Sequence, residues 1–226
     1  MGDLMKMAGI SQTALVYSGM VGMVYLGTDG FQKNAPFVFT LPVVVLGFIT
    51  LSTRMPIMRK ICTSASFFLL ASALYEWSMS PRRLEINASI ITASHIFYLL
   101  SFIGCVKQWW KSLAVLTTLF SICFAYIVFA DLFRSLPWVV LACTMSHSTI
   151  GLNFVAAGSV WKKGSKVPFA ETAAFTRFIG IFFAYICDVA LLSNQFARHT
   201  PQLVFYLNTT YYLSQYMLYF ANERAF

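Results

Sequence analysis

Residues 182–215 read FFAYICDVALLSNQFARHTPQLVFYLNTTYYLSQ, and this stretch decides the fold class. One apolar run with Asp188 inside it is followed by a polar break at Asn194 and by a second apolar run that contains amide and tyrosine side chains. An acid inside a membrane segment costs about 2.5–3.5 kcal/mol and usually faces other helices or a cavity. We therefore expect Asp188 to face neighbouring helices that supply its polar partners.

The composition of the whole chain is that of a membrane protein. Of its 226 residues, 58% are hydrophobic and only 11% are charged, whereas a soluble domain carries about 25% charged residues. Apolar stretches of about 20 residues, enough to cross about 30 Å of hydrocarbon, recur between short polar breaks. We expect about eight spans, near residues 9–28, 35–53, 60–79, 86–106, 111–130, 136–160, 168–193 and 201–221. This predicts an all-α polytopic membrane helix bundle, a single transmembrane domain over residues 1–226.

The basic residues between the spans predict the orientation. Ten lysines and arginines fall on the side of both termini and five on the opposite side, and positive loops stay on the cytoplasmic or equivalent side. The ten are Lys6, Arg54, Arg59, Lys60, Lys107, Lys111, Lys162, Lys163, Lys166 and Arg224. We expect a multi-pass protein of the endoplasmic reticulum or of an organellar membrane such as the mitochondrial inner membrane. This pattern accounts for the net charge of +8 without a nucleic-acid partner.

The cysteines give no sign of a metal or a disulfide framework. All five lie singly inside apolar runs, without paired spacing, and are typical of small buried hydrophobic residues. No other ligand spacing suggests a metal, and no cofactor is expected.

A few polar side chains inside the expected spans are costly enough to need an explanation. They are Glu76, His95, His147, Arg177 and Asp188. The last span adds Asn208, Tyr212, Gln215 and Tyr219, whose i, i+4, i+7, i+11 spacing places them on one helical face. Chemically different groups at related depths indicate a shared cavity.

Structural explanations remain open for most of these groups. His147 lies in a span rich in serine and threonine, where a hydrogen bond to a neighbouring helix is the simpler explanation. Glu76 is close enough to Arg82 and Arg83 for an ion pair at the membrane boundary, and Arg177 can extend toward the basic side with its stem in lipid. The tyrosine-rich face of the last span can be a packing surface. Asp188 is the hardest to explain in this way, because no basic residue lies within a turn of it.

The carboxy-terminal third resembles the YhhN-like lysoplasmalogenases, membrane proteins expected to have eight spans. The matching residues are Gly180, Phe182, Phe183, Asp188, Asn194, Phe196, Thr210, Tyr211, Tyr212 and Gln215, together with Ser94, His95 and Tyr98 in the fourth span and Trp77 in the third. Two charged family positions are replaced: Phe39 stands where the family has a lysine and Ser72 where it has an acid. If these two groups were paired, their joint loss avoids an uncompensated buried charge of about 3–5 kcal/mol.

The resemblance implies hydrolysis of the vinyl-ether bond of a lysoplasmalogen, which releases a fatty aldehyde. One acid would protonate the vinyl carbon, and a carboxylate would stabilise the oxocarbenium ion and activate water. On this basis the expected catalytic residues are Asp188, Glu76 and His95, with Glu76 one turn beyond Ser72 and in place of the missing acid. The residues expected to bind the lipid are Ser72, Tyr98, Arg177, Asn208, Tyr211, Tyr212 and Gln215.

Two functions remain open from the sequence. The first is an active ether-lipid hydrolase whose partner is a lysophospholipid or ether lipid of the membrane. The second is a silent family member that serves as a structural or lipid-binding subunit of a larger membrane complex, because a fold does not carry its function with it. A proton-coupled transporter is weaker, since the sequence has no internal repeat and no pair of broken spans.

Overall fold

The described part of the computed structural model, residues 2–79, 83–197 and 203–226, is helical. It contains eight α-helices and two short 3-10 helices, and none of its residues forms a β-strand. The helices are α1 (Gly2–Gly27), α2 (Pro36–Ser52), α3 (Ile57–Met79), α4 (Leu84–Phe102), η1 (Ile103–Cys105), α5 (Lys111–Phe129), α6 (Pro137–Lys163), η2 (Pro168–Glu171), α7 (Ala174–Phe196) and α8 (Leu203–Ala225). Each expected span corresponds to one α-helix.

Proline and glycine account for several helix ends. α2 and α6 begin at Pro36 and Pro137, where the missing N–H costs nothing because the first turn has no intrahelical acceptor for it. α6 ends at Lys163, and Gly164 follows with φ +81°, a left-handed conformation that favours glycine. These local signals are readable in the sequence.

Six helices form a closed ring. Neighbours around it pack in the order α2, α3, α4, α6, α7 and α8, and α8 returns to α2. The Tyr212 hydroxyl of α8 closes this last contact by donating to the Phe39 carbonyl of α2 at 2.8 Å. The ring positions the candidate site, because side chains from five of its helices meet inside.

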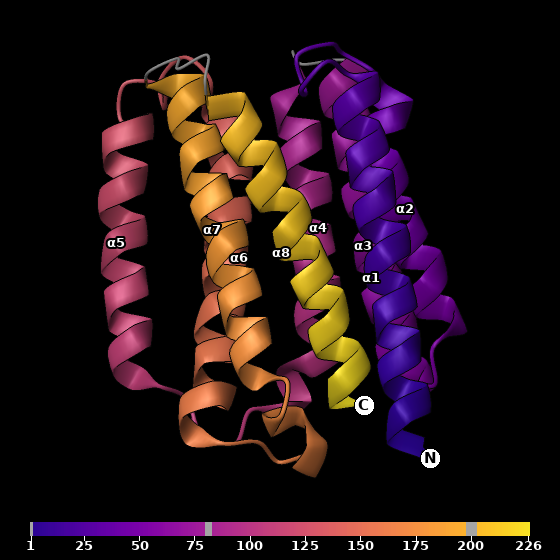
Figure 1. Cartoon of the computed structure of the whole chain (residues 1–226). Helices are drawn as coiled ribbons and strands as arrows, with labels where there is room; N and C mark the ends of the chain where they lie inside the picture. Colours follow the sequence, from indigo (N-terminus) through magenta and orange to yellow (C-terminus); the bar gives the residue numbers. More distant parts are fainter. Residues whose placement is uncertain (1, 80–82, 198–202) are drawn as a thin grey trace.

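The other two helices lie outside the ring (Figure 1). α1 packs on α2 and α8, and the Tyr17 hydroxyl donates to the Tyr212 carbonyl at 2.8 Å. α5 packs on α6 and α7 at the opposite edge. Only 22% of its apolar stretch is buried, against 39–56% for α3, α4, α6 and α7, so much of α5 is left for lipid.

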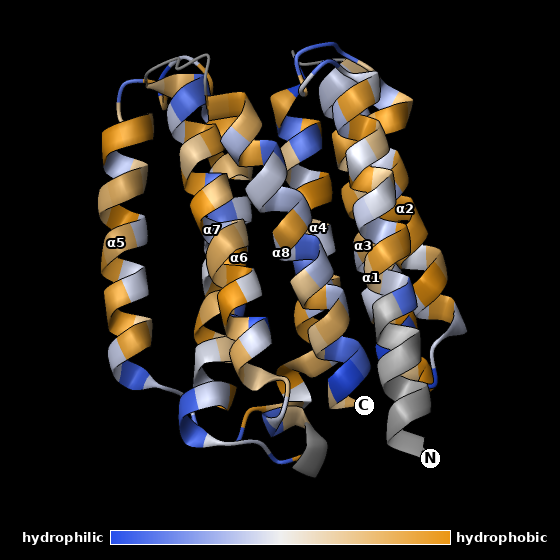
Figure 2. Cartoon of the chain, in the orientation of Figure 1, coloured by the Kyte–Doolittle hydropathy of each residue, from blue (hydrophilic) through white to orange (hydrophobic). Residues whose placement is uncertain are grey.

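The helices fit a multi-pass integral membrane protein. Five of them, α3 to α7, are long and apolar enough to cross a membrane, and α2 is apolar but has 17 residues. Apolar residues cover most of the bundle's sides in Figure 2, and hydrophilic loops lie at its ends. Both termini lie at the same end in Figure 1, as the sequence predicts. Eight crossings, and the membrane side on which the termini lie, stay predictions.

Candidate functional site

A cavity of about 260 Å³ lies inside the ring. Its lining residues come from the parts of α3, α4, α7 and α8 away from the chain termini, with one residue from α6. They are Leu70, Ala73, Leu74, Trp77, Asn87, Ile91, His95, Ile150, Ala184, Cys187, Asp188, Leu191, Asn194, Val204, Leu207, Asn208, Tyr211 and Gln215. Most of this wall is apolar, so the cavity suits a hydrocarbon segment with a few polar groups to orient it.

Asp188 lies in the wall of this cavity and is held from behind by His147. The Nδ1 atom of His147 lies 2.7 Å from Oδ2 of Asp188. The side chains are 2% and 14% exposed respectively, so the pair is almost withdrawn from solvent. Oδ1 of Asp188 has no hydrogen-bond partner among the described residues. The carboxyl therefore has one oxygen fixed by an imidazole and one free for a ligand.

Hydrogen bonds extend from His147 to the outer helix α5. The Nε2 atom of His147 lies 3.2 Å from the Tyr185 hydroxyl, which lies 3.0 Å from the Ser121 hydroxyl. Tyr185 and Phe124 also pack on the imidazole, with ring centroids 5.0 and 4.8 Å away. Both ring nitrogens of His147 thus have partners, which fixes its orientation toward Asp188.

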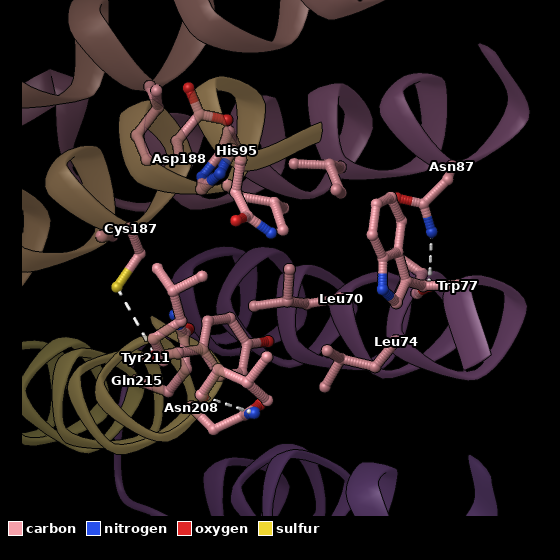
Figure 3. Close-up of a pocket in the computed structure, with 18 residues that line it drawn as sticks. Leu70, Leu74, Trp77, Asn87, His95, Cys187, Asp188, Asn208, Tyr211 and Gln215 are labelled. Carbon is pink, nitrogen blue, oxygen red and sulfur yellow. Dashed lines mark hydrogen bonds between the residues drawn. The ribbon is translucent and has the colours of Figure 1, made fainter. Parts of the chain in front are cut away.

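A second histidine borders the cavity itself. His95 of α4 lies beside Asp188 in Figure 3, and it is within electrostatic reach of the carboxylate. Its backbone carbonyl accepts a hydrogen bond from Nδ2 of Asn153 at 3.0 Å, which ties α4 to α6 at this level. No described residue hydrogen-bonds to its imidazole, so the ring can contact a ligand or water.

α8 supplies the wall opposite Asp188 and His95 (Figure 3). Its cavity-lining polar residues are Asn208, Tyr211 and Gln215. The amide of Asn208 donates to a carbonyl of its own helix, and that of Gln215 donates to Ser214. The buried Tyr211 hydroxyl has no partner among the described residues. An unmade hydrogen bond of a buried group costs about 1–3 kcal/mol, so this hydroxyl is available to a polar group of a ligand.

Three expected lipid-binding residues lie away from the cavity lining. Arg177 is 0% exposed, and its Nη2 donates to Oδ1 of Asn222 at 2.9 Å and to the Ala221 carbonyl at 3.3 Å. The alternative in which its head group extends toward the membrane surface is therefore wrong. Tyr98 and Tyr212 donate to backbone carbonyls of α8 and α2. All three are hydrogen-bonded to neighbouring helices in this structure.

Glu76 and Ser72 are also absent from the lining of this cavity. The Ser72 hydroxyl is exposed and donates to the Phe68 carbonyl of its own helix at 2.9 Å. Glu76 is half-buried, and its Oε1 has no partner among the described residues. Arg82 lies outside the described residues, and Arg83 makes no ion pair within them. The Glu76 carboxyl therefore does not line the cavity that Asp188 borders, and the two acids expected to act as a pair do not share one cavity.

The sequence indicated that Asp188 needs partners from other spans, but not that His147 is one. The spacing of the two residues along the chain nevertheless indicates this contact. α6 and α7 are consecutive and antiparallel, so their residues at equal distance from the shared connection meet. His147 lies 16 residues before Lys163 and Asp188 lies 14 residues after Ala174, or about 24 and 21 Å along the two helices. Asn87 and Cys187 also line the cavity without having been expected there.

Comparison with known proteins gives one match. A family model described as the YhhN family matches residues 37–222. No curated protein and no solved structure matches the chain. The matched range contains every residue that lines the cavity, together with His147, Tyr185 and Ser121. The chain therefore belongs to the YhhN family.

Proposed function

We propose that the protein hydrolyses the vinyl-ether bond of a lysoplasmalogen-type lipid in the cavity that Asp188 borders. The observation that carries this proposal is a carboxyl group in an apolar cavity, with His147 2.7 Å behind it and His95 beside it. A water-poor site strengthens electrostatic interactions with a cation that forms during the reaction. The resemblance of the carboxy-terminal third to the YhhN-like lysoplasmalogenases favours the same chemistry.

The cavity size indicates which part of the lipid it holds. Its volume of about 260 Å³ is below the 300–1,000 Å³ typical of pockets that enclose a whole small molecule. A lysolipid is larger than this, so only a segment of it fits. The apolar lining favours the vinyl-ether carbons and the adjoining methylene groups, with the rest of the lipid outside.

In the proposed reaction the protonated Asp188 transfers its proton to the vinyl carbon that is not bound to oxygen. The carbon–carbon double bond supplies the electron pair, and an oxocarbenium ion forms beside the Asp188 carboxylate. His147 donates from Nδ1 to that carboxylate and keeps it in place. Because the carboxylate that remains is itself the counter-ion of the cation, a second acid is not needed.

Water then completes the hydrolysis. It adds to the carbon bound to oxygen, guided by the free imidazole of His95, and returns a proton to Asp188. The resulting hemiacetal separates into a fatty aldehyde and the glycerol hydroxyl of the head-group fragment. We expect the Tyr211 hydroxyl, which has no partner among the described residues, to bond to this glycerol end, with Asn208 beside it in the cavity wall. One water molecule is consumed, and Asp188 ends in the protonation state in which it began.

A silent lipid-binding protein is the second candidate. The composition of the cavity wall favours it, because Asp188 is the only carboxylate among the described residues that line the cavity. In this function the cavity would hold a lipid segment without reaction, and the protein would serve as a structural or lipid-binding subunit of a membrane complex.

Aldehyde release from a lysoplasmalogen by the purified protein in detergent separates these candidates. We expect release by the wild type, loss of at least 100-fold in Asp188→Asn, consistent with loss of a general acid, and little change in Glu85→Gln, which alters a carboxyl outside the cavity. Glu76→Gln decides which acids act: retained activity supports Asp188 with its histidines, and loss supports the acid pair expected from the sequence. A wild type that releases no aldehyde would leave the silent candidate.

A further inference from the structure

A second hollow lies on the other side of α6, between α5 and α6. It is an open groove of about 640 Å³ that shares no lining residue with the cavity of Asp188. It is lined by Trp109, Lys111, Ala114, Thr117, Thr118, Ser121, Ile122, Ala125, Thr144, His147, Ser148, Gly151, Leu152 and Val155. Small and hydroxyl side chains dominate this list, which is why the two helices leave space between them.

The groove has the length of a lipid chain. Its lining on α5 runs from Lys111 to Ala125, 14 residues or about 21 Å of helix. Half of a hydrocarbon layer is about 15 Å thick, so the groove extends over more than one leaflet. Leu152, Val155 and Ile122 add apolar walls to it. An acyl chain that enters from the Lys111 end can therefore lie in the groove over its full length.

One end of the groove is strongly basic. Lys111 lines it, and four more exposed lysines lie in the adjoining segments of the chain: Lys107, Lys162, Lys163 and Lys166. Two loops bring them together, because the Lys166 N–H donates to the Cys105 carbonyl at 3.0 Å and the Trp110 N–H donates to the Ser159 hydroxyl at 2.9 Å. This end is also the one at which both chain termini lie in Figure 1.

These lysines have no acidic partners in the described part of the chain. The ion pairs found there join Lys33 to Asp29 and His147 to Asp188. The nearby Glu171 carboxylate instead accepts from the Ser165 N–H at 3.0 Å. Trp109 and Trp161, 41% and 42% exposed, lie in the same region, where tryptophan is typical of the interface between water and hydrocarbon. The lysine cluster thus makes no ion pair within the described residues, and it lies at the expected depth of lipid phosphates.

From the groove and the lysine cluster together we infer a binding site for an anionic phospholipid, with its phosphate at Lys111 and one acyl chain between α5 and α6. Basic pockets between membrane helices on the positive side are typical sites for anionic head groups. The lipid is separate from the one in the cavity, but its chain would contact His147, the residue that holds Asp188. The site does not depend on the proposed hydrolysis.

The test is lipid retention by native mass spectrometry. The full-length protein is extracted from bilayers of phosphatidylglycerol and phosphatidylcholine in equal amounts, and the lipids that stay bound are identified. We expect the wild type to retain phosphatidylglycerol in preference to phosphatidylcholine. One lysine near a membrane surface changes affinity about fivefold, so Lys111→Gln should lower retention by that factor and Lys107→Gln with Lys111→Gln by about thirtyfold.

Matched variants test the two halves of the site. Thr118→Trp places a large side chain in the groove at an exposed position of α5, and we expect it to abolish retention. Cys123→Trp makes the same change at an exposed position outside the groove. Lys33→Gln removes a lysine at the other end of the bundle. Both variants should retain phosphatidylglycerol as the wild type does. Equal retention of the two lipids, or retention unaffected by Lys111→Gln, would overturn the proposal. Loss in the lysine variants with full retention in Thr118→Trp would also overturn it, because binding would then need only the surface charge.

Discussion

Replacing His147 by leucine removes the hydrogen-bond partner of Asp188 while a side chain of similar size stays on α6. Breaking a fully buried charge pair costs about 3–5 kcal/mol. Asp188 is 14% exposed and borders a cavity, where it can contact water, so the loss is nearer that of a charged hydrogen bond, about 1.5–3 kcal/mol. We expect a destabilisation of about 2 kcal/mol. For a protein of this size this lowers Tm by about 4–8 °C.

A double-mutant cycle measured by thermal unfolding in detergent tests whether this cost belongs to the pair. The cycle compares wild type, His147→Leu, Asp188→Ala and the double variant. We expect the double variant to lose at least 1 kcal/mol less stability than the two single variants lose together, as for residues in contact. Ser64→Ala with Asp188→Ala is the control, because Ser64 of α3 donates to the Gly47 carbonyl of α2 and does not line the cavity of Asp188. Additivity within about 0.5 kcal/mol in the first cycle would refute the pairing of His147 with Asp188.

Five further variants test the packing around the site by thermal unfolding, two of them as comparisons. Arg177→Met removes a buried charge that has no carboxylate partner among the described residues, so the Tm of this variant should equal or exceed that of the wild type. Asn222→Leu breaks hydrogen bonds to three helices and should lower Tm clearly. Gly180→Val adds a Cβ 3.0 Å from two α8 side chains and should cost about 1–3 kcal/mol; Gly19→Val, with open space around it, is the control. Tyr212→Phe removes the hydrogen bond from α8 to the Phe39 carbonyl of α2 and should cost about 1 kcal/mol. A lower Tm in Arg177→Met, or equal losses in the two glycine variants, would contradict these assignments.

The helices could be predicted from the sequence because each has its own local signals. Apolar length sets α3 to α7, and Pro36, Pro137 and Gly164 mark ends that depend only on neighbouring residues. The position of α5 outside the ring has no such signal. Its apolar surface is equally compatible with lipid and with protein, so only packing decides how much of it is buried.

The site could be predicted in part. A lone acid in a membrane segment requires partners, and Asp188 does face a cavity with His95 in its wall. Depth and the position one turn beyond Ser72 placed Glu76 near Asp188. The direction of a side chain around its helix also matters, and Glu76 is not among the residues that line the cavity. For His147 the sequence predicted a hydrogen bond to a neighbouring helix but not the partner, because only the packing of α6 against α7 selects Asp188.

The most direct test of the account is to run the lysoplasmalogen reaction in D₂O and to trap the aldehyde as it forms. If Asp188 delivers a solvent-exchanged proton to the vinyl carbon, the aldehyde from the wild type carries one deuterium on the carbon next to the carbonyl, and Asp188→Asn yields no aldehyde above background. Aldehyde without that deuterium, or undiminished release by Asp188→Asn, would contradict the proposed role of Asp188.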